Sequence, residues 1–129
     1  MSRRLQLISY CARAALAVVF IWHGLVPKLL WLSADEVAMI EAHGFPAPAM
    51  VAAISGVLEI IMGVAILVYQ RNHWPLMLAG SILIALLVDV ALFSPHLLIQ
   101  AFNPVSLNLA AIALCIIAAL AQVPGAKAT

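Results

Sequence analysis

Charged residues are scarce in this chain: Asp, Glu, Lys and Arg make up 9% of its 129 residues, whereas 67% are hydrophobic. A soluble domain carries about a quarter charged residues. This chain therefore cannot cover a water-facing surface, and we expect lipid to be its main solvent. Its net charge is only +1 and its basic residues form no stripe, which gives no support for a nucleic-acid partner. The length corresponds to a single domain.

Cysteine is also scarce, and residues that would mark a built-in cofactor are missing. The two cysteines, Cys11 and Cys115, lie too far apart for a disulfide framework or a metal knuckle. There is no CxxC pair and no nucleotide-binding glycine loop. A haem or metal site made of His23, His43 and His96 has no supporting ligand spacing. We therefore expect no metal site and no intrinsic cofactor.

What the chain has in abundance is long apolar runs. A membrane-spanning helix needs about 20 apolar residues and satisfies its own backbone hydrogen bonds in lipid. The first run is too long for a signal-peptide core and no small-x-small cleavage site follows it, so we expect it to be retained. Pro75, Pro104 and the N-cap residue Asn103 mark helix starts, and Gly125 marks the last stop. The prediction is an all-α integral membrane protein, a four-transmembrane-helix bundle with spans at about 5–27, 49–70, 75–95 and 104–122.

The polar segment SADEVAMIEAHG lies between the first two spans. Ser33 and Glu36 have the spacing of a capping box, and Gly44 is a natural C-terminal stop. These signals predict a short amphipathic helix at about 34–43 that lies on the membrane surface. An ordered loop is the alternative.

Basic residues near the spans predict the orientation. Arg3, Arg4, Arg71 and Lys127 fall on one side of the membrane, whereas Lys28 falls on the other. Because cytoplasmic loops carry the excess of Lys and Arg, both termini are expected to be cytoplasmic.

Ionisable residues inside the spans are the candidates for function. Each costs about 2.5–3.5 kcal/mol at mid-membrane on insertion scales, so such residues face the bundle interior and have partners. A rise of about 1.5 Å per residue places Arg13 and Glu59 at a similar depth, which predicts a buried ion pair. An outer polar group is predicted to form a ligand pocket: His23, Lys28, Asp89 and Asn108.

More than one interpretation of these residues stays open. The Arg13–Glu59 pair could fix which helices meet, or it could serve a proton path or a ligand site. His23 could be a hydrogen-bonded structural residue or part of a functional pocket. Glu59, His23 and Asp89 are the candidate catalytic groups, but the pattern assigns no catalytic role to any of them.

Three segments resemble the DoxX-like family of small bacterial membrane proteins. The first span, RAALAVVFIWHGLVPKLL, is similar to the family's opening helix, and SGVLEIIMGVAIL is similar to its Gly-x-x-Glu helix. FNPVSLNLA resembles the family's Asn-Pro start of the fourth span. The matching positions are Arg13, Gly24 and Lys28, then Gly56, Glu59 and Gly63, and finally Asn103, Pro104 and Asn108.

The resemblance implies a four-helix bundle in the bacterial inner membrane, in a family whose members include small subunits linked to quinone-dependent oxidation. By this resemblance the chain would be a subunit of a quinone-linked redox assembly, offering a polar pocket for a bound quinone or for partner docking. Its partners would be the lipid bilayer and other redox subunits, and a homo-oligomer is also possible.

Other functions stay open beside that one. An autonomous membrane enzyme could act on an apolar small molecule by acid/base chemistry, with Glu59 or Asp89 as the base and Lys28 or His23 as the acid. A purely structural or assembly protein would use the polar residues only to lock helix packing. Proton or ion conduction ranks below these.

Overall fold

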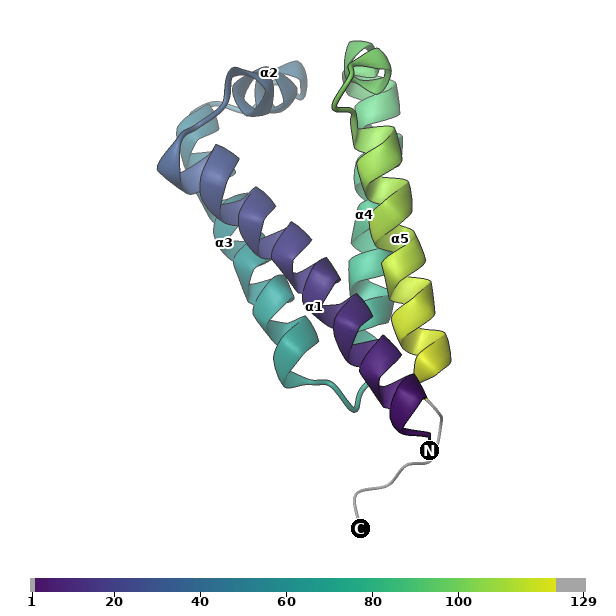
Figure 1. Cartoon of the computed structure of the whole chain (residues 1–129). Coiled ribbons are helices and arrows are strands. Elements are labelled where there is room, and N and C mark those ends of the chain that lie inside the picture. Colours follow the sequence, from purple (N-terminus) through teal and green to yellow (C-terminus); the bar gives the residue numbers. More distant parts are fainter. Residues whose placement is uncertain (1, 123–129) are drawn as a thin grey trace.

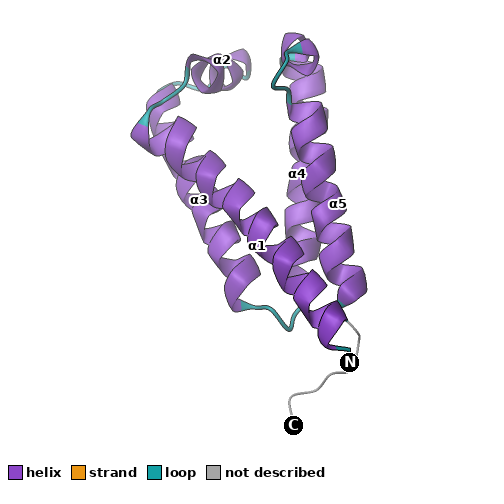
Figure 2. Cartoon of the chain, viewed as in Figure 1, coloured by secondary structure: helices purple, strands orange, loops and turns teal. Residues whose placement is uncertain are grey.

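The structure, a computed structural model, describes residues 2–122, and within that range every regular element is helical. Four helices are long and apolar enough to cross a membrane, which confirms the predicted all-α fold. Gly125 and Lys127 lie outside the described residues. The long helices are α1 (Arg3–Leu25), α3 (Pro48–Val68), α4 (Trp74–Phe93) and α5 (Pro104–Ala121) (Figures 1 and 2). Three short elements join them: η1 (Val26–Leu30), α2 (Ala34–Ala42) and η2 (Pro95–Ile99).

Side-chain caps begin three of these helices. Ser2 accepts a hydrogen bond from the backbone N–H of Leu5 at the start of α1. The predicted caps are confirmed at α2, where Ser33 Oγ accepts from the N–H of Glu36 at 3.1 Å, and at α5, where Asn103 caps the first turn. Such bonds satisfy backbone donors that a helix start leaves free.

The short helix α2 ends as the sequence predicts. Its last helical residue is Ala42, and Gly44 follows in a left-handed conformation with φ of 78°. Glycine adopts this conformation without steric cost. The helix lies across one end of the bundle, whereas the start of α1 and the end of α5 lie at the other end (Figure 1). Which end faces the cytoplasm stays a prediction.

The buried core joins α1 to its neighbours. α1 packs along α3 and α5, and α5 packs along α4. Small residues and a few large ones alternate in this core, which lets the helices approach closely. Its fully buried members include Leu16, Ala17, Ile66, Ala79 and Ala118.

Most large apolar side chains instead point outward. Val18, Leu58, Met77 and Leu120 are among those more than half exposed. A protein in water would not present so many, but a bilayer solvates them as well as a protein core does. The chain is therefore a multi-pass membrane protein whose outer faces contact lipid.

The bundle opens at the end that carries α2. The α1–α3 pair and the α4–α5 pair lie close together near the start of α1 and diverge toward α2 and η2 (Figure 1). This divergence places the candidate site at the wide end.

Candidate functional site

A cavity of about 860 Å³ lies at the wide end, lined by residues of every helix. Its walls are largely apolar, and Phe20, Leu83 and Val90 are among them. The predicted pocket residues all line it, and so does Glu59. These predicted residues are His23, Lys28, Asp89 and Asn108. Their role in binding stays a prediction, but the fold brings them to one cavity.

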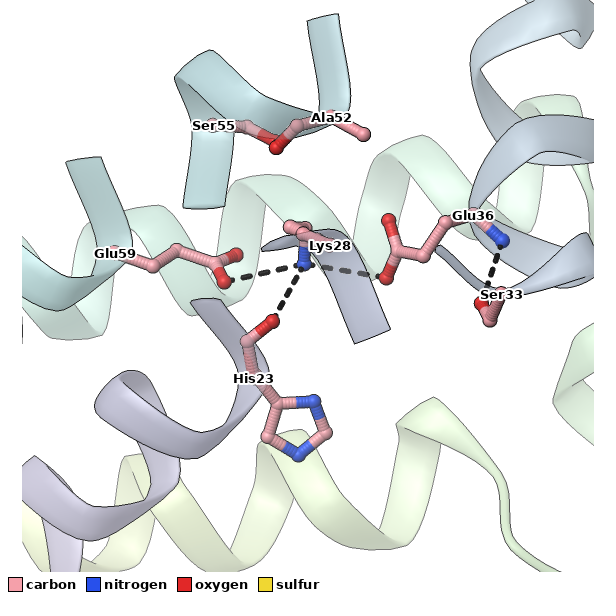
Figure 3. A network of polar contacts seen from close by, with 7 residues as sticks. All are labelled: His23, Lys28, Ser33, Glu36, Ala52, Ser55 and Glu59. Atoms are coloured by element: carbon pink, nitrogen blue, oxygen red, sulfur yellow. Dashed lines mark hydrogen bonds and ion pairs between the residues drawn. The ribbon is translucent and has the colours of Figure 1, made fainter. Parts of the chain in front are cut away.

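Lys28 is at the centre of the polar network in this cavity. Its ammonium group lies 3.1 Å from a carboxylate oxygen of Glu59 and 3.1 Å from one of Glu36, and it donates to the carbonyl oxygen of His23 at 3.3 Å (Figure 3). The contacts with Glu59 and with the His23 carbonyl are hydrogen bonds, and the contact with Glu36 is an ion pair. The Lys28 side chain is only 9% exposed. The network ties η1 to both α2 and α3.

Local backbone structure explains how Lys28 reaches both carboxylates. Residues 26–30 form a single π-helical turn, closed by a 2.9 Å bond from the N–H of Trp31 to the carbonyl of Val26. Pro27 has no N–H, and its carbonyl accepts from the N–H of Ser33. That bond fixes the start of α2, where Ser33 caps the turn that carries Glu36.

A second polar contact joins α2 to α4. His43 Nε2 lies 2.7 Å from Asp89 Oδ1, and His43 Nδ1 lies 2.7 Å from the carbonyl oxygen of Met39. Because a carbonyl and a carboxylate only accept, this geometry suits the doubly protonated ring. The hydrogen bond with Asp89, followed by that with Met39, raises the pKa of His43. The ring also stacks on Phe93, with centroids 4.1 Å apart.

Asn108 and His23 complete the polar lining. Asn108 is 8% exposed, and its amide nitrogen donates to the carbonyl of Leu83 at 3.2 Å, which links α5 to α4. The imidazole of His23 points away from Lys28 in Figure 3, and it is the backbone carbonyl that makes the contact. Within residues 2–122, no group of three or more His, Cys, Asp or Glu side chains is placed to hold a metal ion.

The predicted ion pair between Arg13 and Glu59 is wrong. Glu59 binds Lys28, and Arg13 lies near the opposite end of the bundle. Its guanidinium donates to the carbonyl oxygens at the end of α3 and in the following loop, and to the side chain of Gln122, which directly follows α5. The acceptors are Ile66, Tyr69, Asn72 and Gln122.

Antiparallel register explains the error. Gly56 lies against Gly24, and Gly63 lies against Ala17, so each step up α1 is a step down α3. Glu59 then falls beside residues 21–24 of α1. Arg13 is at least eight residues away, which is about 12 Å along a helix. Depths counted from the estimated span ends placed Arg13 and Glu59 at a similar level, because they do not include this offset between α1 and α3.

Sequence reasoning also missed two residues of the site. Glu36 is on α2, His43 directly follows the last residue of α2, and both line the cavity. Their helix was predicted, together with the capping of Glu36, but the way it folds back over the bundle depends on the π-helical turn. No pattern in the sequence announced that turn, apart from Pro27.

Comparison with known proteins places the chain in a family. A sequence profile described as the DoxX-like family matches residues 17–116, which include η1, α2, α3 and α4. No curated protein and no solved structure matches the chain. Because the matched segment covers most of the sequence and most of the cavity, the chain belongs to the DoxX-like family.

Proposed function

We propose that the cavity binds the head of a quinone, and that the protein is a small membrane subunit of a quinone-linked redox assembly in the bacterial inner membrane. The observation that carries this proposal is the cavity itself. Its volume of about 860 Å³ lies in the range typical of small-molecule sites, which combine apolar walls with a few polar groups. A quinone has the matching form, an apolar body with a polar head.

The position of the cavity supports a ligand dissolved in lipid. It lies where the two helix pairs diverge, and all four spans contribute residues to its walls. A quinone could reach it from the membrane. Because the sequence has no CxxC pair and no nucleotide-binding glycine loop, we propose that a partner subunit supplies the electron carrier.

A labelling experiment tests this proposal. Native membranes containing the tagged chain are irradiated with a photoreactive quinone, and the labelled peptides are identified by mass spectrometry. We expect label on peptides that line the cavity, and a loss of most of that label in His23→Ala and Asp89→Ala. His96→Ala is the matched control, because His96 is exposed and does not line the cavity. Label confined to lipid-facing peptides, or unchanged in both cavity variants, would rule the proposal out.

One observation favours a second function. Lys28 is held between two carboxylates in a mostly apolar cavity, and groups placed in this way can exchange protons with a substrate. An autonomous acid/base enzyme would then use Glu59 as its base. Turnover of an apolar substrate by the purified chain alone, abolished in Glu59→Gln and retained in Glu41→Gln, would support this function over the first.

A further inference from the structure

The cationic groups of the cavity are already paired with acceptors of the chain. Lys28 is the one Lys or Arg among the described lining residues. Its ammonium group donates hydrogen bonds to Glu59 and to the carbonyl of His23, and it forms an ion pair with Glu36. In His43, both ring nitrogens are engaged as well, by Asp89 and by a backbone carbonyl. A ligand head therefore meets cations that are already satisfied.

Acceptors, in contrast, remain open. Glu36, Glu59 and Asp89 each use one carboxylate oxygen in the contacts above and keep the other free of any bond to residues 2–122. The side-chain oxygen of Asn108, a residue that is 8% exposed, also has no partner within residues 2–122, because the one contact of this side chain runs from its amide nitrogen to the Leu83 carbonyl. The cavity thus presents to its contents four acceptor atoms that have no partner among the described residues.

The charge of the lining also favours a ligand head that donates hydrogen bonds. With Asp35, four carboxylates line the cavity, opposite Lys28 and His43. A neutral imidazole at His23 adds no charge to the lining, and it offers one hydrogen-bond donor and one acceptor. The lining is therefore negative overall and attracts a head that carries hydrogen-bond donors.

The two redox forms of a quinone differ in this respect. A quinone head presents carbonyl oxygens, which only accept, whereas the hydroquinone presents two O–H groups that donate. A hydroxyl bonded to a carboxylate makes a charge-assisted hydrogen bond, about twice as strong as a neutral one. We propose that this cavity is selective for the reduced form and binds a hydroquinone more tightly than the matching quinone. This inference rests on the proposed function.

Such selectivity changes the redox behaviour of the bound molecule. A site that binds the reduced form tenfold more tightly raises the midpoint potential of a two-electron couple by about 30 mV. The bound quinone then accepts electrons more readily than the same quinone in the bilayer. The site would favour quinone reduction by the assembly.

Calorimetry on the purified chain in lipid nanodiscs tests the inference. A short-tailed benzoquinone and its hydroquinone are titrated separately under anaerobic conditions. We expect the hydroquinone to bind at least tenfold more tightly. Equal affinities, or tighter binding of the quinone, would overturn the selectivity and leave the proposed function standing. Absence of binding by both forms would overturn the two together.

A charge-neutral variant tests whether the carboxylates cause the selectivity for the hydroquinone. Glu59→Gln keeps an acceptor for Lys28 but replaces the free carboxylate oxygen with an amide donor, so the ratio of the two affinities should fall severalfold. Because the ratio is measured within one preparation, partial loss of folded protein does not affect it. Glu41→Gln removes the same charge from an exposed position outside the cavity and should leave the ratio unchanged. An unchanged ratio in Glu59→Gln would contradict the role given to the carboxylates.

Discussion

Gly24 of α1 and Gly56 of α3 meet backbone to backbone. A Cβ atom on Gly56 would lie 2.5 Å from the carbonyl oxygen of Gly24, closer than real Cβ contacts allow. Alanine is the better helix former by about 1 kcal/mol, but a backbone carbonyl cannot rotate away. We expect Gly56→Ala to destabilise the bundle by about 1–3 kcal/mol, as overpacking does, in a denaturant titration in detergent micelles.

Gly80→Ala is the matched control for that substitution. Gly80 is also within a long helix, but its nearest foreign atoms would be 4.0 Å from an added Cβ, on Cys115. This is ordinary contact, so we expect Gly80→Ala to be neutral or stabilising. Equal destabilisation by both substitutions would mean that the crossing of α1 and α3 is not the cause.

Arg13 should be the most important polar residue for stability. It is 1% exposed and binds backbone carbonyls at the end of α3, which a helix end leaves without partners. Arg13→Leu leaves these carbonyls unsatisfied, and we expect a loss of about 3 kcal/mol or more in the free energy of unfolding. Gln122→Ala removes one acceptor only and should cost about 1–2 kcal/mol. The same denaturant titration measures both, and a larger effect of Gln122→Ala would contradict the assignment.

Lys28→Met should destabilise the wide end of the bundle. It leaves Glu59 and Glu36 facing one another without their shared cation, and we expect a loss of about 2–3 kcal/mol. Glu59→Gln should cost less, because Lys28 keeps Glu36 and the Gln side chain still accepts a hydrogen bond. The comparison requires unfolding curves of both variants under identical conditions. Lys28→Met as stable as the parent chain would show that the network contributes no net stability.

The contact between His43 and Asp89 predicts a pH dependence. The folded pKa of His43 is raised above its ordinary value of about 6.5. The stabilisation is therefore fully present below that ordinary value, and it is lost as pH rises through the raised pKa. Asp89→Asn removes the main cause of the shift, so the His43 pKa should fall. Histidine ring signals followed by NMR across this range measure it. An unchanged midpoint in Asp89→Asn would contradict the contact.

The sequence was enough to predict the fold but not the pairing of its charges. Span positions, the α2 helix and the caps at Ser33 and Asn103 all follow from local patterns, because a membrane leaves the backbone few alternatives. Arg13 and Glu59 show what local patterns could not predict. Their pairing depends on how far α1 is offset against α3, and the contact of Gly24 with Gly56 sets that offset.

The residues of the candidate site that lie on the spans were predictable, whereas those on the short segment between the spans were not. Depth alone grouped His23, Lys28, Asp89 and Asn108 at one end, and all four line one cavity. Depth could not add His43, because its position depends on how α2 folds back from a turn with no sequence signature. Residues on the spans were thus easier to place than residues on the short helix between them.

The π-helical turn at residues 26–30 makes the site sensitive to chain length as well as to side-chain identity. Deleting Val26 or Pro27 would restore regular helix and rotate everything downstream by about 100°. Lys28 would swing away from Glu59, and α2 would leave the cavity, although every core contact of α1 before Leu25 could persist. A single-codon deletion would therefore remodel the mouth of this cavity in one step, whereas each point substitution would change one contact at a time.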